Sequence, residues 1–115
     1  MTCINSLGNG LILNNQNLPA IKPKDGLGGV GGPFCKPFGL ANVREFKRYL
    51  PELDIIGCGG ISTAQDMYEY FLCGASAVQI GTHFLHNGIT CFEKLEKDFK
   101  ELLREKGLSS VREIR

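Results

Sequence analysis

The sequence predicts an α/β protein with a parallel sheet, because short apolar strands alternate with amphipathic helical segments along the chain. The clearest strands are the apolar runs at 54–57 and 77–80, and each is followed by glycines and then by a helical pattern of apolar residues. This alternation is typical of parallel strands joined by right-handed crossover helices. We therefore expect one layer of parallel strands, two of which end in glycine turns.

The N-terminal part predicts a strand at 2–6, a hairpin and a glycine-rich loop. Two short extended segments, 11–13 and 20–22, flank the turn-rich sequence NNQNLP, and we expect them to form the hairpin. The stretch KDGLGGVGG then contains G-x-G-x-x-G, but a Rossmann loop must enter a helix directly, and two prolines postpone the next helix to about Gly39. We expect this stretch to be a flexible surface loop.

Apolar residues recur at helical spacing in three later segments. The first is stopped by Pro51, and the longest is stopped by Gly107. In the second, Ser62 is a candidate N-cap with Gln65 at the capping-box position. We expect helices at 40–50, from Ser62 to about Cys73, at 89–106 and, capped by Ser109 or Ser110, at 111–114.

Composition and charge argue against nucleic acid and membranes as partners. The 13 basic residues are interspersed with 12 acidic ones, so we expect no face of one charge sign. No apolar run approaches the roughly 20 residues of a spanning helix, and the N-terminus lacks the features of a secretory signal. We therefore expect a cytoplasmic protein. The five cysteines lack metal-ligand spacing, and His83 and His86 have no second ligand pair nearby, so we expect free thiols and no metal site.

Two glycine turns, GCGG at 57–60 and QIGT at 79–82, form a candidate phosphate site. Each stands at the carboxyl end of an apolar strand, and adjacent parallel strands would place the two turns side by side. Glycine lets the backbone approach a ligand and leaves amide groups free for phosphate oxygens. Either turn alone could merely end a strand and let a helix pack closely. Together, with the earlier glycine loop at one side, they predict a phosphate site on Gly59, Gly60, Gly81 and the hydroxyl of Thr82, as loops after the last two strands of (β/α)8 barrels frequently form.

Six segments of the chain resemble the dihydroorotate dehydrogenases of the soluble, fumarate-coupled class 1A: TCINSLGNGL, IKPKDGLGGVGG, KPFGLANVREF, IIGCGGI, FLCGASAVQIGT and GLSSVREI. The resemblance covers nearly the whole chain. It implies a TIM (β/α)8 barrel that binds FMN over the carboxyl ends of its strands and oxidises dihydroorotate to orotate in pyrimidine (UMP) biosynthesis, with fumarate as electron acceptor. It also implies a homodimer for the full-length enzyme.

The resemblance implies roles for several residues. Asn5 and Ser6 match a pair that contacts the substrate, where an amide and a hydroxyl can hydrogen-bond the pyrimidine ring and its carboxylate. From the residues alone, a turn or capping role for this pair is an equal alternative. Cys58 lies between glycines near the flavin, but a small side chain in a tight turn is the simpler interpretation. The implied cofactor-binding residues are Ile4, whose backbone lies against the flavin, Gly32, and the phosphate-binding Gly59, Gly60, Gly81 and Thr82.

On this resemblance, residues 1–115 are the C-terminal portion of a flavin-binding barrel domain, with about three βα units and a β-hairpin. A whole (β/α)8 barrel needs roughly 250 residues, so we expect the catalytic base, a cysteine in this class, to lie upstream. The chain is then expected to be a fragment that has no catalytic residue, is inactive alone and exposes apolar strands. Two alternatives stay open: a phosphate-binding barrel isomerase or synthase without flavin, and a non-catalytic half-barrel that self-associates.

Overall fold

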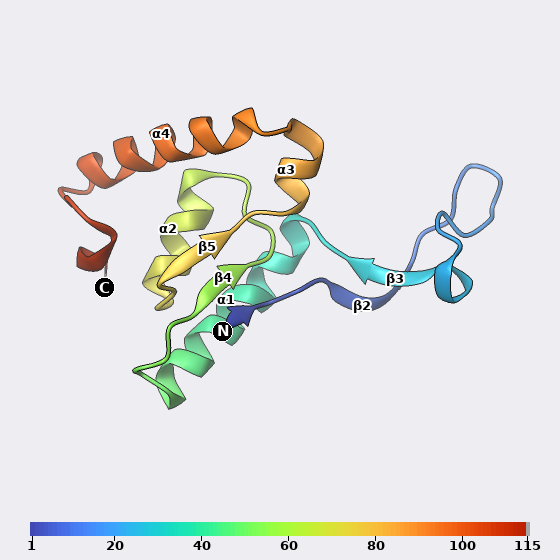
Figure 1. Cartoon of the computed structure of the whole chain (residues 1–115), viewed down its shortest axis with the longest axis horizontal. Coiled ribbons are helices and arrows are strands. Elements are labelled where there is room, and N and C mark those ends of the chain that lie inside the picture. Colours follow the sequence, from blue (N-terminus) through green and yellow to red (C-terminus); the bar gives the residue numbers. More distant parts are fainter. Residues whose placement is uncertain (115) are drawn as a thin grey trace.

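A parallel sheet forms the centre of the structure, a computed structural model that describes residues 1–114 (Figure 1). Its strands are β1 (Thr2–Cys3), β4 (Ile56–Cys58) and β5 (Ala77–Gln79), in the order β1-β4-β5. Gly57 lies in the central strand, opposite Cys3 on one side and Val78 on the other. The predicted α/β fold with a parallel sheet is confirmed, although each strand is shorter than predicted.

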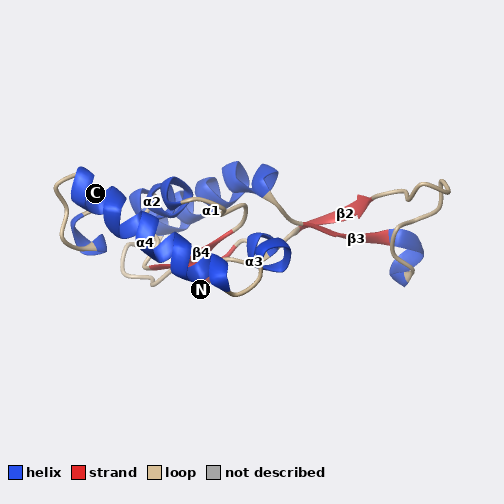
Figure 2. Ribbon diagram, turned by 90° about the horizontal axis from the view of Figure 1, so that it is seen from above, coloured by secondary structure: helices blue, strands red, loops and turns tan. Residues whose placement is uncertain are grey.

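Helices alternate with the strands of this sheet in the described part of the chain. α1 (Lys36–Tyr49) leads into β4, α2 (Ala64–Leu72) connects β4 to β5, and α3 (Thr82–Asn87) and α4 (Thr90–Glu105) follow β5. α1 and α2 lie together on one side of the sheet, and α4 passes alongside α2 (Figure 2). Single turns of 3-10 helix lie at Pro23–Gly26, Pro33–Cys35 and Val111–Glu113.

The main apolar core lies between the sheet and helices α1 and α2. A second cluster joins α4 and the C-terminal segment to α2, where Phe71 stacks on Phe99 with ring centroids 5.5 Å apart. Burial of such side chains is the dominant favourable contribution to folding, at about 25 cal/mol for each Å² of apolar surface removed from water. The large side chains of the main core that are completely buried are Val43, Ile55 and Tyr70.

Two glycines make room for the ring of Tyr70. A Cβ at Gly39 would lie 1.8 Å from the Tyr70 Oη atom, and a Cβ at Gly57 would lie 2.3 Å from its Cδ1 atom. Neither glycine has a positive φ. Space, rather than backbone conformation, therefore requires glycine at these two positions, one in α1 and one in β4.

Helix α2 begins one residue later than predicted. Thr63, not Ser62, is the N-cap: its side chain accepts a hydrogen bond from the Asp66 amide, and the Asp66 carboxylate accepts one from the Thr63 amide at 2.8 Å. The residue predicted for the capping box, Gln65, instead donates to Glu69 along the helix. The sequence offers two adjacent hydroxyl residues and two adjacent acceptors, so the motif fits both registers. Burial of Asp66 decides between them.

The hairpin is longer than predicted and includes half of the glycine-rich stretch. β2 (Leu7–Leu11) pairs antiparallel with β3 (Leu27–Val30), so the prediction of a flexible surface loop over 24–32 is wrong. The pairing depends on glycine having no side chain, because a Cβ at Gly10 would lie only 1.9 Å from Val30 Cγ2. Glycines in this stretch therefore let two backbones approach closely.

The predicted hairpin segments 11–13 and 20–22 meet beyond the end of these strands. They are joined by an isolated bridge between Leu13 and Pro19 and by a hydrogen bond from the amide of Ala20. Together with β2 and β3 they form an arm that projects away from the sheet (Figures 1 and 2).

Two helix boundaries also differ from the predictions. α1 begins at Lys36, earlier than the predicted start at Leu40, because Pro37 occupies its first turn, where a missing amide hydrogen costs no helical hydrogen bond. The short helix α3 was not predicted and precedes α4, which matches the predicted 89–106 within one residue at each end. Ser110 caps the final 3-10 turn, as one of the two predicted caps.

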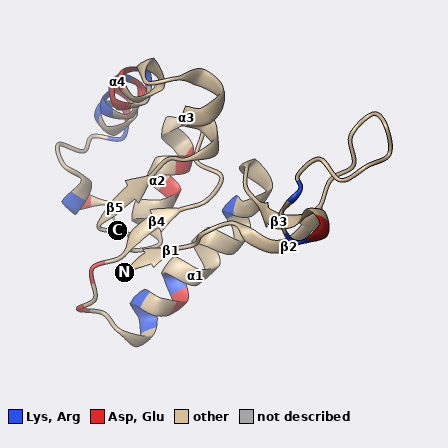
Figure 3. Ribbon diagram, turned by 45° about the vertical axis from the view of Figure 1, so that its right-hand side comes forward, with Lys and Arg blue, Asp and Glu red and all other residues tan. Residues whose placement is uncertain are grey.

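Charges of both signs share the outer faces of α1 and α4 (Figure 3). Exposed pairs of this kind contribute only about 0–1 kcal/mol each, so these charges add little to the stability of the fold. Across residues 1–114, the structure contains no helix with the length and apolar character that a membrane span requires. The exposed ion pairs are Arg48 with Glu45, Lys94 with Asp98, and Lys100 with Glu96.

Replacing Gly57 by alanine is expected to lower the free energy of unfolding by about 2 kcal/mol, because the added methyl group would overlap the buried ring of Tyr70. Gly8→Ala is the matched control, since a Cβ at that position meets nothing within 4 Å. It should change the free energy of unfolding by less than about 0.5 kcal/mol. Urea denaturation measures both values, and equal effects would contradict the packing argument.

Candidate phosphate and flavin site

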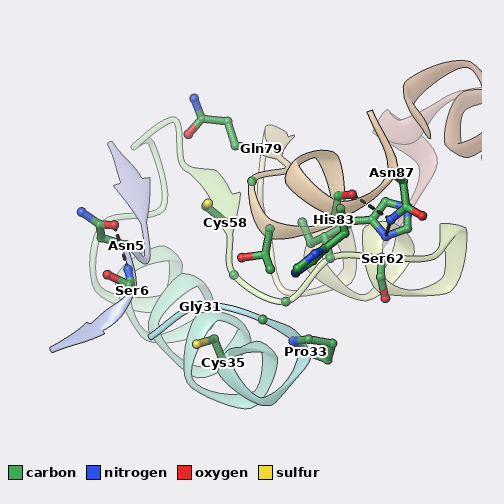
Figure 4. Close-up of a pocket in the computed structure, with 17 residues that line it drawn as sticks. Asn5, Ser6, Gly31, Pro33, Cys35, Cys58, Ser62, Gln79, His83 and Asn87 are labelled. Carbon is green, nitrogen blue, oxygen red and sulfur yellow. Dashed lines mark hydrogen bonds between the residues drawn. The ribbon is translucent and has the colours of Figure 1, made fainter. Parts of the chain in front are cut away.

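A cavity of about 240 Å³ lies at the carboxyl ends of β4 and β5 (Figure 4). Its walls come from segments that are far apart in the sequence: the residues after β1, the glycine loop before α1, the turn after β4 and the start of α3. Ile4 is absent from the lining but lies just behind it, with its Cγ1 atom 3.3 Å from where a Cβ at Gly59 would be. The other predicted site residues all line the cavity: Asn5, Ser6, Gly32, Gly59, Gly60, Gly81 and Thr82.

Three glycine turns lie close together beside this cavity. A Cβ at Gly60 would lie 2.8 Å from the Pro33 carbonyl oxygen and 2.9 Å from that of Gly32. A Cβ at Gly31 would lie 2.8 Å from the Thr82 hydroxyl oxygen. The end of the early glycine loop therefore borders both turns that were predicted to bind phosphate.

Backbone amides of these turns are available to a ligand. Gly59 and Gly60 have φ values of 128° and 69°, which glycine adopts readily and other residues do not. Within residues 1–114, the amides of Gly59, Gly60 and Gly81 donate no hydrogen bond to another protein group. Successive amides in turns of this kind, when they have no acceptor in the protein, can bind an anion.

Asn5 and Ser6 lie across the cavity from α3 (Figure 4). The Asn5 Oδ1 atom accepts a hydrogen bond from the Ser6 amide at 2.8 Å, so the pair does have the local turn role that the sequence left open. Both residues are nevertheless exposed at the cavity wall. The Ile4 amide donates to the Cys58 carbonyl at 2.7 Å and so ties this segment to the turn after β4.

Two cysteines line the cavity. Burial raises the pKa of Cys58 above its ordinary value, so its thiol is protonated at neutral pH and a poor nucleophile or base. The Cys35 thiol donates to the Val30 carbonyl at 3.2 Å. All five cysteines of the chain carry free thiols.

Helix α3 adds residues that the sequence analysis did not assign to a site. His83, His86 and Asn87 line the cavity, and Asn87 Nδ2 donates to the His83 carbonyl at 2.8 Å. Gly88 at the end of this helix, read together with Thr82 at its start, was the signal that could have revealed it. In the part of the chain described by the structure, no group of three or more His, Cys, Asp or Glu side chains is arranged to hold a metal ion.

Lys36 bridges two acidic residues beside the cavity, and of these three side chains only that of Asp66 is buried. Lys36, at the start of α1, binds Asp66 at 2.6 Å and Glu69 at 2.7 Å, both on α2. Burial alone would raise the pKa of Asp66, but hydrogen bonds from Lys36 and from the Ser62 and Thr63 amides outweigh it and lower the pKa to about 2. The carboxylate is therefore ionised at neutral pH and fixes the segment that follows Gly60.

Comparison with known proteins assigns the chain to a family. The family model for dihydroorotate dehydrogenase matches residues 1–103. The chain belongs to the dihydroorotate dehydrogenase family. The predicted resemblance to this family is thereby confirmed, and the family is one of oxidoreductases.

Individual relatives are similar over the entire chain. The dihydroorotate dehydrogenase (fumarate) of Lachancea kluyveri is 47% identical over 117 aligned residues, which cover 100% of this chain and 37% of the relative. A putative dihydroorotate dehydrogenase A (fumarate) of Streptococcus pyogenes serotype M5 is 47% identical over 116 residues, and one of Streptococcus agalactiae serotype Ia is 45% identical, with the same coverages. The chain thus spans about 37% of the length of the curated relatives it matches.

Lowering the pH is expected to decrease the difference in the free energy of unfolding between the wild type and Asp66→Asn. The pKa of Asp66 is about 2 in the folded chain, below the roughly 3.9 of an unfolded aspartate. The ionised carboxylate therefore stabilises the fold fully above about pH 4, and this contribution is lost as the pH falls through about 2. Urea denaturation of both proteins between about pH 5 and pH 2 measures the difference, and a constant difference would contradict this assignment.

Proposed function

We propose that this chain forms the FMN-phosphate part of the active site of a dihydroorotate dehydrogenase. The enzyme would oxidise dihydroorotate to orotate in pyrimidine biosynthesis and pass the electrons to fumarate. One observation carries this proposal: three glycine turns and the hydroxyl of Thr82 converge on one cavity at the carboxyl edge of a parallel sheet. Family membership and the names of the relatives support the reaction.

In this proposal the sheet is part of a (β/α)8 barrel. The parallel order of β1, β4 and β5 supports this, as do the connection of β4 to β5 through a helix and the position of the cavity at the strands' carboxyl ends. Complete small-molecule sites usually enclose about 300–1,000 Å³. A cavity of about 240 Å³ suits one end of a cofactor better than the whole of FMN.

The phosphate of FMN is assigned to the two glycine turns. The Gly59, Gly60 and Gly81 amides and the Thr82 hydroxyl supply donors, and close backbone packing at Gly60 leaves no room for a side chain that would block them. Gly32 and the backbone of Ile4 would lie beside the flavin. When bound, FMN supplies the redox chemistry.

Asn5 and Ser6 are assigned to the substrate. Their exposed side chains stand at the cavity wall opposite α3, where an amide and a hydroxyl can orient a ring that carries both carbonyl and carboxylate groups. Cys58 is assigned no proton transfer, because burial keeps its thiol protonated. In this proposal the chain therefore binds and orients the cofactor and the substrate. None of its side chains is given the role of catalytic base.

We also propose that the enzyme is a homodimer. The arm formed by β2, β3 and the segment between them supports this assembly, because its apolar side chains lie in solvent and an exposed apolar patch of this kind marks an interaction site. Those at least 42% exposed are Leu11, Ile12, Leu13, Leu18, Ile21 and Leu27.

FMN is expected to bind the chain more tightly than riboflavin, which lacks the phosphate, and Thr82→Ala or Gly81→Ala should weaken FMN binding about tenfold. For Thr82→Ala, loss of one hydrogen bond to a charged group corresponds to about this factor. A Cβ at Gly81 meets nothing within 4 Å, so the substitution obstructs the ligand without straining the protein. Quenching of flavin fluorescence measures each dissociation constant.

Gly8→Ala is the control for this experiment, since it adds the same methyl group in open space on β2. Its affinity for FMN should equal that of the wild type. Equal affinities of the wild type for FMN and riboflavin would contradict the phosphate assignment. Tight binding of sugar phosphates without flavin binding would favour a phosphate-binding isomerase or synthase.

A further inference from the structure

The phenol of Tyr70 reaches the backbone of the phosphate turn from inside the core. Its hydroxyl donates to the Gly59 carbonyl oxygen at 2.7 Å, and its side chain is completely buried. Burial raises the pKa of Tyr70 well above its ordinary value, so the group remains a protonated donor at every physiological pH. The ring is held in place by the close packing of Gly39 and Gly57 around it.

This hydrogen bond determines where the next amide points. Within a planar trans peptide, the carbonyl oxygen and the following N–H point in opposite directions. When Tyr70 holds the Gly59 carbonyl toward the core, the Gly60 amide hydrogen points away from the core. Gly60 lines the cavity, and its amide has no acceptor within residues 1–114.

A peptide between two glycines needs such a constraint. Glycine accepts both signs of φ at little cost, so the peptide plane between Gly59 and Gly60 can rotate more freely than others. Its position is already fixed, because Gly60 packs against the backbone of Gly32 and Pro33. Rotation of the peptide plane is the freedom that remains, and the hydrogen bond from Tyr70 restricts it.

We propose that Tyr70 is a positioning residue that aims the Gly60 amide at the phosphate of the bound cofactor. The proposal rests on the phosphate assignment made above and adds a residue that touches neither the ligand nor the cavity. Hydrogen-bond donors that are oriented before the ligand arrives bind more tightly than donors that must be ordered on binding. Tyr70 thus contributes to the affinity for the phosphate specifically.

Tyr70→Phe removes the hydroxyl and keeps the ring, and Tyr68→Phe is the matched control. Tyr68 lies on the same helix, with its ring 4.5 Å from Lys106 Nζ and away from the glycine turn. Dissociation constants for FMN and riboflavin are measured for the wild type and both variants. We expect Tyr70→Phe to weaken FMN binding about tenfold and riboflavin binding less than about twofold, and Tyr68→Phe to change neither.

The ratio of the two affinities separates positioning from general support of the fold. A purely structural loss would weaken both flavins equally, and this result would overturn the role of Tyr70. A preference for FMN that Tyr70→Phe retains would overturn it as well, while leaving the phosphate site intact. If the wild type itself showed no preference for FMN, the phosphate assignment would fail.

A second measurement needs no flavin. In ¹⁵N-labelled protein, the amide resonance of Gly60 should shift or broaden in Tyr70→Phe because the peptide plane is released, and it should be unchanged in Tyr68→Phe. Titration with inorganic phosphate should then move the Gly60 resonance of the wild type more than that of Tyr70→Phe. An unaltered Gly60 resonance in Tyr70→Phe would overturn the inference whatever the flavins do.

Discussion

The packing of the Tyr70 ring against the backbone of Gly39 and Gly57 sets the spacing of the elements around the cavity. The ring fills the space where α1, β4 and α2 meet, and any Cβ at Gly39 or Gly57 would occupy the same volume. Interiors are packed at near crystalline density, so the three elements cannot separate or close further without loss. The turn that follows β4 is therefore held at a fixed depth relative to the start of α1.

The buried Asp66 and its partner Lys36 act on the other side of the same turn. Asp66 accepts hydrogen bonds from the Ser62 and Thr63 amides and binds Lys36, so the first turn of α2 is tied to the first turn of α1. Removing Lys36 would leave the buried Asp66 carboxylate without its charged partner, which costs more than losing an exposed pair. Gly60 lies between these anchors and the hydroxyl of Tyr70, in a segment that is constrained from both ends.

Those structural features that depend on residues adjacent in the sequence could be predicted from the sequence. Apolar runs followed by glycines located β4 and β5, and their parallel order placed the turns at Gly60 and Thr82 beside one cavity. The pairing of β3 could not be seen, because glycine-rich strands carry little local signal and this one depends on the distant Gly10. The cap of α2 was misplaced by one residue because the sequence pattern fits both registers, and the burial of Asp66 in the fold favours the second.

In the proposed site, backbone amides bind the phosphate and side chains contact the substrate. This difference explains why the phosphate site could be predicted from the sequence and the reaction could not. Backbone amides of glycine turns recognise a phosphate through geometry, and glycine at the ends of two strands is a strong local signal. Redox chemistry and proton transfer need particular side chains in contact with the reacting ring. Asn5 and Ser6 are proposed to bind the substrate and not to carry out these steps. Their own hydrogen bond in the turn shows that a polar pair can be positioned by local structure before any ligand binds. An anchoring function can thus be inferred from spacing alone, whereas the reaction had to be inferred from the family.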